Sequence, residues 1–345
     1  MKYQDNVNHL GYITLSQILG CILVILGHSY PFITEIPNTL ELIRIIIYSF
    51  HMPLFVFCSG FLFAYTQQSE RKTLQEYVWT RFRKLLIPYL VLSLIGILPK
   101  YIFSPVLNDS LQLDFHSLIR ALFVPRENIW GHFWFLPMIF FMGIIAYLFE
   151  RSTKQINNKI LIWTSIIIIL IAVVLVYSPI SILNWFGIND IIKYSWSYAL
   201  GVLMAYVLKK FKINLKLSWA LSIISSLLLV CIALIIFPYM ELPVIQLFMS
   251  IFLIAATLII SIFLSSKINI NRKSMVAQTY QIFILSWPCQ LVVEILLERV
   301  LHLQWWLIMP AVFLLGIFMP IIILKLVDVI ERKANTHYLS LIIGK

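Results

Sequence analysis

The chain has 345 residues, of which 61% are hydrophobic and only 12% are charged. A soluble domain is closer to about 45–50% apolar and about 25% charged. The mean hydropathy of +0.92 excludes a water-soluble fold, a disordered tail, a coiled coil and a disulfide-rich secreted module. The sequence therefore predicts an integral membrane protein with an all-α, polytopic fold.

Ten apolar segments approach the roughly 20 residues that a helix needs to span a bilayer. In chain order they are 11–33, 42–66, 85–103, 130–149, 160–178, 194–208, 217–238, 244–264, 277–298 and 305–330. The sixth is short and is expected to borrow residues from its flanks. No segment between them is long enough to fold separately, so residues 1–345 are expected to form a single integral-membrane domain.

The formal net charge of +11 would suggest nucleic acid binding in a soluble protein. Here the positive-inside rule explains it, because Lys and Arg accumulate in cytoplasmic loops. With the N-terminus in the cytoplasm, 20 of the 26 Lys and Arg residues fall on the cytoplasmic side of the predicted helices. We therefore expect both termini in the cytoplasm, a multi-pass protein of a cell inner or plasma membrane, contact with membrane lipids and no nucleic acid partner.

The four cysteines all lie within apolar runs: Cys21, Cys58, Cys231 and Cys289. Their spacing fits no metal site, and none lies in a loop where it could pair with another. They are expected to be buried as small hydrophobic residues.

Ionisable side chains within the predicted helices are functional candidates, because each costs about 3 kcal/mol to insert. His28 ends the first apolar run, His51 lies in the second helix and His132 begins the 130–149 helix. Arg44 lies seven residues before His51 and shares its face, and Glu294 approaches the same level from the 277–298 helix. The topology predicts a cluster of these groups that opens outward.

Each candidate has a structural alternative. His51 is also consistent with a histidine hydrogen-bonded to a neighbouring helix. His132 lies beside Trp130 and Trp134, as expected of an interfacial aromatic belt. Arg44 is also consistent with snorkelling to the surface, and Glu294 with a structural hydrogen-bond acceptor.

Three cations lie within four residues where the chain leads into the 85–103 helix: Arg81, Arg83 and Lys84. Such a group can bind phosphates through charge-assisted hydrogen bonds. Anchoring to anionic lipid is the alternative.

Five stretches resemble the acyltransferase family 3 membrane proteins, in the order of the chain. They are QILGCILVILGHS from Gln17, HMPLFVFCSGFLF from His51, RFRKLLIPY from Arg81, HFWFLP from His132 and TYQIFILSWPCQ from Thr279. Two positions depart from the family pattern. Gln17 stands where the family usually has Arg or Lys, and Ser286-Trp287 stands where many relatives have a histidine.

The resemblance implies a ten-helix enzyme that transfers an acyl group from cytoplasmic acyl-CoA to a hydroxyl of an extracytoplasmic glycan. We expect the acyl group to be acetyl, acetyl-CoA to be the co-substrate, and the acceptor to be a cell-surface polysaccharide or a lipid-linked glycan precursor. The richness in Ile, Lys and Asn suggests a bacterial source. No metal is expected.

The resemblance and the ionisable residues within the predicted helices together give a hypothesis for the roles of single residues. His28 would act as general base or carry the acyl group, with His51 and Glu294 beside it. Gln17 would contact the donor, and so would the cations Arg81, Arg83 and Lys84. Arg44, His132 and Trp134 would bind the acceptor.

A proton-coupled transporter or flippase of glycan intermediates or small solutes is the alternative function, because buried histidines and a glutamate also suit proton coupling. Such carriers often contain inverted repeats, and the sequence shows no repeat.

Overall fold

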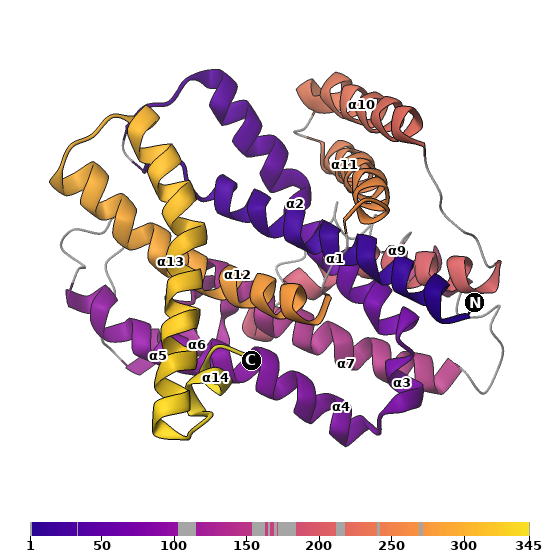
Figure 1. Cartoon of the computed structure of the whole chain (residues 1–345), viewed down its shortest axis with the longest axis horizontal. Helices are drawn as coiled ribbons and strands as arrows, with labels where there is room; N and C mark the ends of the chain where they lie inside the picture. Colours follow the sequence, from indigo (N-terminus) through magenta and orange to yellow (C-terminus); the bar gives the residue numbers. More distant parts are fainter. Residues whose placement is uncertain are drawn as a thin grey trace. The chain divides into compact units, whose positions relative to one another are not determined.

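The computed structural model describes residues 2–32, 34–102, 115–153, 184–211, 218–239, 242–268 and 272–344, with a few positions between 163 and 171. Within these ranges all regular secondary structure is helical (Figure 1). Nine of the helices are long and apolar enough to cross a membrane. The prediction of an all-α polytopic membrane protein is therefore confirmed.

The nine candidate spans in the described part of the chain match nine of the predicted segments. They are Leu10–Gly27, Asn38–Tyr65, Leu74–Tyr101, Gly131–Ser152, Trp185–Lys210, Trp219–Tyr239, Val244–Ser265, Gln278–Val300 and Trp305–Ala334. The remaining predicted segment, 160–178, lies almost entirely outside the described residues. The placement of both termini in the cytoplasm stays a prediction.

The first predicted segment, 11–33, is wrong at its C-terminal end, because helix α1 (Lys2–Gly27) stops at Gly27. Pro31 has no N–H to continue the helical ladder. The N–H groups of Phe32 and Thr34 instead donate to the carboxylate of Glu298. The residues after α1 therefore form an irregular connection to the next helix.

The described chain divides into two compact units. Unit 1 consists of Met1–Tyr65 and Trp196–Ile321, and unit 2 of Thr66–Ser195 and Ile322–Lys345. Helices α9 (Ile188–Lys210) and α13 (Trp305–Ala334) contribute residues to both units.

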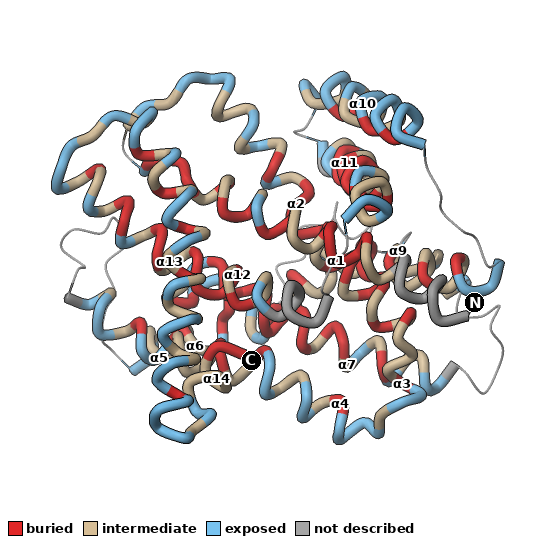
Figure 2. The backbone as a smooth tube through the Cα atoms, viewed as in Figure 1, coloured by how far each residue is buried: buried red, intermediate tan, exposed pale blue. Residues whose placement is uncertain are grey.

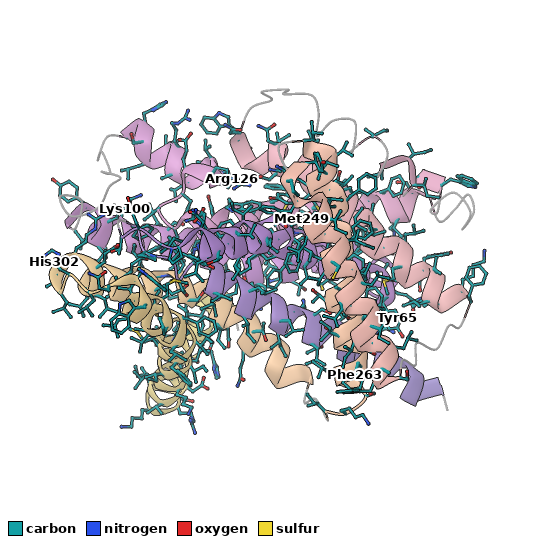
Figure 3. The ribbon with its side chains drawn as sticks, turned by 90° about the horizontal axis from the view of Figure 1, so that it is seen from above. Tyr65, Lys100, Arg126, Met249, Phe263 and His302 are labelled. Carbon is teal, nitrogen blue, oxygen red and sulfur yellow. The ribbon has the colours of Figure 1, made fainter. Side chains whose placement is uncertain are left out.

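Unit 1 contains, besides parts of α9 and α13, helices α1, α2 (Asn38–Tyr65), α10 (Trp219–Ile236), α11 (Pro243–Ser265) and α12 (Arg272–Glu294), the last continued by the π-helix η6 (Ile295–Val300). Helix α1 packs on α2, α11 and α12, and α10 packs on α11. Figure 3 shows the side chains along α11, with fully buried Met249 in its N-terminal half and half-buried Phe263 near its C-terminal end. The hydroxyl groups of Ser16 and Ser261 join α1 to α11 at 2.9 Å.

The backbones of α2 and α9 touch within unit 1 at two glycines. A Cβ atom at Gly60 would lie 2.2 Å from the carbonyl oxygen of Tyr198, and one at Gly201 would lie 2.1 Å from that of Phe57. Ser197 donates to the Pro53 carbonyl at 2.6 Å in the same crossing. Small residues and a serine hydroxyl are the usual means by which membrane helices approach closely.

Much of helix α10 is exposed (Figure 2), and the residues that it buries are small: Ser222, Ser226 and Ala233. Leu227, Leu228 and Ile235 are exposed, whereas Ser226 is buried against α11. This arrangement suits a helix that faces lipid, where packing rather than apolar burial joins helices. It also corrects the prediction for Cys231, which is exposed on this helix. The other three cysteines are buried as expected.

Unit 2 contains helices α3 (Gln68–Arg71), α4 (Leu74–Arg81), the π-helix η1 (Phe82–Leu86), α5 (Ile87–Ile102), α6 (Phe115–Phe123), α7 (Phe135–Thr153) and α14 (Tyr338–Ile342). Three short 3-10 turns complete it: η2 (Pro125–Glu127), η3 (Gly131–Trp134) and η4 (Trp185–Gly187). Helix α4 begins with a capping box between Thr73 and Glu76, which satisfies N–H groups at the helix start. Buried Asn128 ties α5 to α6 by donating to Ser93 Oγ and to the Ala121 carbonyl.

Candidate active site

His28 lies one residue beyond the end of α1, in unit 1. Its N–H still donates to the Val24 carbonyl at 3.0 Å, so the backbone continues the last helical turn. The imidazole packs between two aromatic rings, with its centroid 4.4 Å from that of Trp287 and 5.5 Å from that of Tyr48. His28 is half-buried and Tyr48 is 46% exposed, so the pair is open on one side.

The Tyr48 hydroxyl lies 3.0 Å from Nδ1 of His28. If Nδ1–H donates to this oxygen, the lone pair of the neutral imidazole is on Nε2. In that tautomer Tyr48 orients the ring and leaves Nε2 to accept a proton, as in other acid–base sites.

His51 lies on the other side of the same tyrosine, with ring centroids 5.2 Å apart. It is buried, and its Nδ1 donates to the Ile47 carbonyl at 2.7 Å. The structure therefore brings His28 and His51 together through Tyr48. This contact to the backbone of its own helix is also what a structural histidine would make.

One face of α12 and η6 lines the end of α1. Trp287, Gln290, Glu294 and Glu298 follow each other at spacings of three and four residues, which places them on one face of a helix. Trp287 contacts His28, and Glu298 accepts hydrogen bonds from Phe32 and Thr34 beyond it. His28, Phe32 and Thr34 therefore all contact this face.

Gln290 is fully buried and fixes the last turn of α1 directly. Its side-chain amide donates to the Ile25 carbonyl at 2.8 Å and to Ser29 Oγ at 3.0 Å. Gly316 of α13 leaves room for it, because a Cβ atom there would lie 2.7 Å from Cγ of Gln290. Gln290 of α12 therefore fixes residues on both sides of His28, namely Ile25 and Ser29.

Glu294 is 0% exposed, and no described residue forms a hydrogen bond of ordinary geometry to either carboxylate oxygen. A buried polar group without a partner is rare and costly, so it points to a proton, a water molecule or a ligand. Gln17, eleven residues before His28 on α1, has a buried amide oxygen that is likewise unsatisfied within the described chain.

Arg44 is half-buried and pairs within its own helix. Its guanidinium donates to Glu41 at 2.5 Å and lies 5.7 Å from the ring centroid of Tyr30. Burial raises the pKa of the Tyr30 phenol above its usual value, while the Arg44 cation opposes this shift. Arg44 therefore has structural partners, and its predicted contact with an acceptor stays a prediction.

The three predicted donor-binding cations lie in unit 2, at the end of α4 and in η1. Arg81 points inward and donates to the Ile139 carbonyl at 3.1 Å, with its guanidinium 5.3 Å from the Tyr77 ring centroid. Arg83 instead lines a cavity. Arg83 and Lys84 both lie in the π-helical turn, a rare irregularity that is frequent at functional sites.

His132 and Trp134 both lie in the short turn η3 of unit 2 and are buried. The His132 ring packs on Phe133 at 4.6 Å. Trp134 lies between two residues, with the Arg126 guanidinium 3.6 Å from its ring centroid and the Tyr194 ring stacked on it at 5.4 Å.

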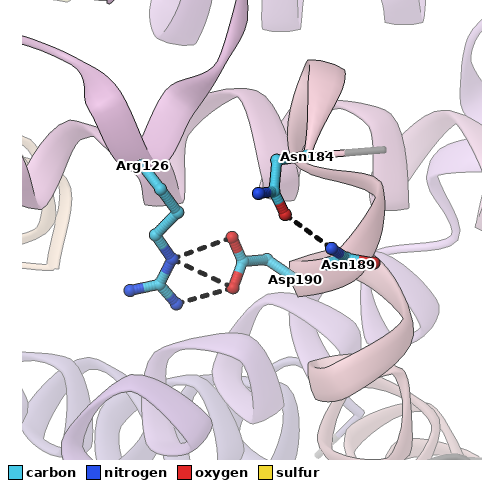
Figure 4. Close-up of polar contacts among 4 residues, drawn as sticks. All are labelled: Arg126, Asn184, Asn189 and Asp190. Atoms are coloured by element: carbon cyan, nitrogen blue, oxygen red, sulfur yellow. Dashed lines mark hydrogen bonds and ion pairs between the residues drawn. The ribbon is translucent and has the colours of Figure 1, made fainter. Parts of the chain in front are cut away.

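An ion pair fixes Arg126 over that indole. Its guanidinium binds the buried carboxylate of Asp190 at 2.6–3.2 Å (Figure 4). Burial alone would lower the pKa of Arg126, but the Asp190 carboxylate raises it above its ordinary value. The predicted acceptor residue Trp134 is thus part of a charged and aromatic cluster.

Sequence reasoning missed Tyr48, Gln290 and Glu298, and also Arg126 and Asp190. The spacing of Gln290, Glu294 and Glu298 within an apolar run was a usable signal for one polar face. No comparable pattern marks Tyr48, which is 20 positions from His28 in the sequence. Among the described residues, no group of three or more His, Cys, Asp or Glu side chains is arranged to hold a metal ion.

Comparison with known proteins identifies the family to which the chain belongs. The sequence model of a family described as an acyltransferase domain matches residues 10–325, which is nearly the whole chain and parts of both units. No match is found among the curated proteins or the solved structures. With its apolar helices and this match over most of its length, the chain belongs to acyltransferase family 3.

Proposed function

We propose that the chain transfers an acetyl group from acetyl-CoA to a hydroxyl of an extracytoplasmic glycan or a lipid-linked glycan precursor, with His28 as general base. Membership of the family supports acyl transfer in a membrane. The observation that carries the assignment of the base is the contact of His28 Nδ1 with the Tyr48 hydroxyl. A cell inner or plasma membrane is the proposed location.

The proposed reaction needs one group that accepts a proton and later returns it. Nε2 of His28 takes the proton of the acceptor hydroxyl, and the oxygen attacks the carbonyl carbon of the thioester. The tetrahedral intermediate collapses, the carbon–sulfur bond breaks, and the sulfur leaves with the proton from the imidazolium. The products are an ester and free CoA. General base catalysis of this kind contributes about 10²–10⁴-fold in rate.

Other residues are assigned to the same reaction. His51, which shares Tyr48 with His28, and the unsatisfied carboxyl of Glu294 are proposed to assist in proton transfer. Gln17 and the cations Arg81, Arg83 and Lys84 are proposed to bind the donor. Arg44, His132 and Trp134 are proposed to bind the acceptor.

Radiolabelled acetyl-CoA tests this proposal on the purified protein in nanodiscs. The label released as acetate or retained on the protein is measured for the wild type, His28→Ala and His116→Ala. His116 is an exposed histidine in α6 and is the matched control. We expect slow turnover in the wild type and the control, and a rate lower by about 10²-fold or more in His28→Ala. Melting temperatures check that each variant is folded.

Two other outcomes would change this assignment. Label that stays on wild-type protein and is absent from His28→Ala would make His28 the carrier of the acyl group rather than a base. A wild type that neither binds nor hydrolyses acetyl-CoA would contradict the proposal and favour the transporter or flippase.

A further inference from the structure

A cavity of about 620 Å³ lies within unit 2, at the C-terminal end of α13. Its wall includes Arg83 of η1, Asp328, Glu331 and Arg332 of α13, and Asn335 and His337 of the turn after it. Figure 1 shows α14 folded back beside this end of α13, and α14 also packs on α5. The volume lies within the range of about 300–1,000 Å³ that is typical of small-molecule sites.

The turn that closes the cavity is held by the buried carboxylate of Glu331. Both of its oxygens accept hydrogen bonds from Ser340, one from the backbone N–H at 2.7 Å and one from the hydroxyl. Asn335 adopts a left-handed conformation with φ 49° that reverses the chain. His337 is therefore held on the wall by a defined turn, although it is exposed.

The cations on this wall are available to a ligand to different degrees. Within the described residues, no hydrogen bond or ion pair engages the Arg83 guanidinium, in contrast to Arg81, which binds a backbone carbonyl. Arg332 uses its Nε to donate to the Asp328 carbonyl at 3.1 Å, which leaves its terminal NH₂ groups for other contacts. Both arginines are exposed.

The arginine, carboxylate and amide groups of the wall are complementary to one class of ligand. Two guanidinium groups match the geometry of phosphate oxygens and bind them in pairs of hydrogen bonds. The Asp328 carboxylate and the Asn335 amide supply acceptors for hydroxyl or amino groups. A molecule that carries several phosphates together with ribose hydroxyls and an amino group fits this set, and such a molecule is a nucleotide.

We propose that this cavity binds the phosphorylated nucleotide end of the acyl-CoA donor, with Arg332 and His337 joining Arg83 at its phosphates. This inference rests on the proposed function and extends the donor site to the C-terminal turn, to which sequence analysis assigned no role. The phosphate of a lipid headgroup has part of the same chemistry, so the experiment separates the two sources.

The test measures CoA binding to the full chain in phosphatidylcholine nanodiscs by calorimetry. Arg332→Gln and Arg83→Gln are compared with Lys333→Gln, which removes the same charge at an exposed position next to Arg332 that does not line the cavity. We expect CoA affinity to fall about tenfold or more in the first two variants, and less than about twofold in the control. Pantetheine, which has no nucleotide, should bind the wild type and all three variants alike.

Two results would overturn the inference and leave the proposed function intact. One is wild-type CoA affinity in Arg332→Gln while Arg83→Gln loses affinity, which would keep Arg83 as a donor contact and exclude the C-terminal turn. The other is unchanged CoA affinity in Arg332→Gln together with loss of co-purified anionic phospholipid, which would assign this part of the cavity to a lipid headgroup. A wild type that does not bind CoA at all would contradict the proposed function itself. Equal melting temperatures of the variants exclude misfolding as the cause of a loss.

Discussion

In unit 1 the imidazole of His28 is held by neutral groups, a phenol and an indole, whereas in unit 2 the guanidinium of Arg126 is held by a carboxylate and an indole. The two settings have different consequences. A neutral partner lets the imidazole gain and lose a proton without breaking an ion pair. A carboxylate stabilises the charged form of its partner and opposes any change. The first setting suits proton transfer and the second suits a fixed structural contact.

The largest expected effect comes from breaking the ion pair in unit 2. Arg126→Leu leaves the buried Asp190 carboxylate without its cation, and we expect a loss of about 2–3 kcal/mol in stability. The double variant Arg126→Leu/Asp190→Leu should recover part of this loss, because no buried charge remains. Thermal unfolding in detergent measures the difference. Arg120→Leu is the control, since Arg120 and its partner Glu127 are both exposed and such pairs add little.

The same variant also tests whether the cluster around Arg126 is structural rather than functional. If Arg126→Leu leaves stability unchanged but abolishes turnover, the cluster around Trp134 is not a structural contact, and its role as an acceptor site gains support.

The sequence was sufficient to predict where the helices lie, but not which other helices they contact. Runs of about 20 apolar residues identify a membrane helix by composition alone, so α2 and α11 were predicted within a few residues. The end of α1 was not, because it depends on Pro31 and on hydrogen bonds to Glu298 on a distant helix. The π-helical turns were missed for a related reason, since their composition does not differ from that of an α-helix.

The candidate site was predictable where one residue is unusual for its surroundings. His28, His51 and Glu294 are ionisable groups in apolar runs, and this alone made them candidates. Tyr48 and Gln290 are not ionisable at neutral pH and did not stand out. Their importance comes from the way α1 packs on α2 and α12, which no local pattern in the sequence determines.

An intermediate effect is expected in unit 1 from the residue that fixes the end of α1. Gln290→Leu keeps the approximate volume but removes the hydrogen bonds to Ile25 and Ser29. On the proposed mechanism the shift of His28 lowers kcat about tenfold, because small misplacements of a catalytic group are costly. Turnover of acetyl-CoA measures it. Val292→Ala, an exposed position on the same helix, should leave kcat unchanged, and a Gln290→Leu rate equal to that control would remove Gln290 from the site.

The smallest and sharpest effect is expected from Tyr48→Phe, which keeps the ring between His28 and His51 and removes only the hydroxyl. Unlike Arg126→Leu, this change leaves no buried charge unpaired, so the melting temperature should stay at the wild-type value. The imidazole of His28 loses the group that orients Nδ1, and on the proposed mechanism kcat falls by about fivefold to tenfold while KM is unchanged. Steady-state kinetics separates the two constants, with exposed Tyr239→Phe as the control. A fall in melting temperature with unchanged kcat would make the tyrosine a packing residue, and the neutral partners around His28 would then have the same structural role as the charged ones around Arg126.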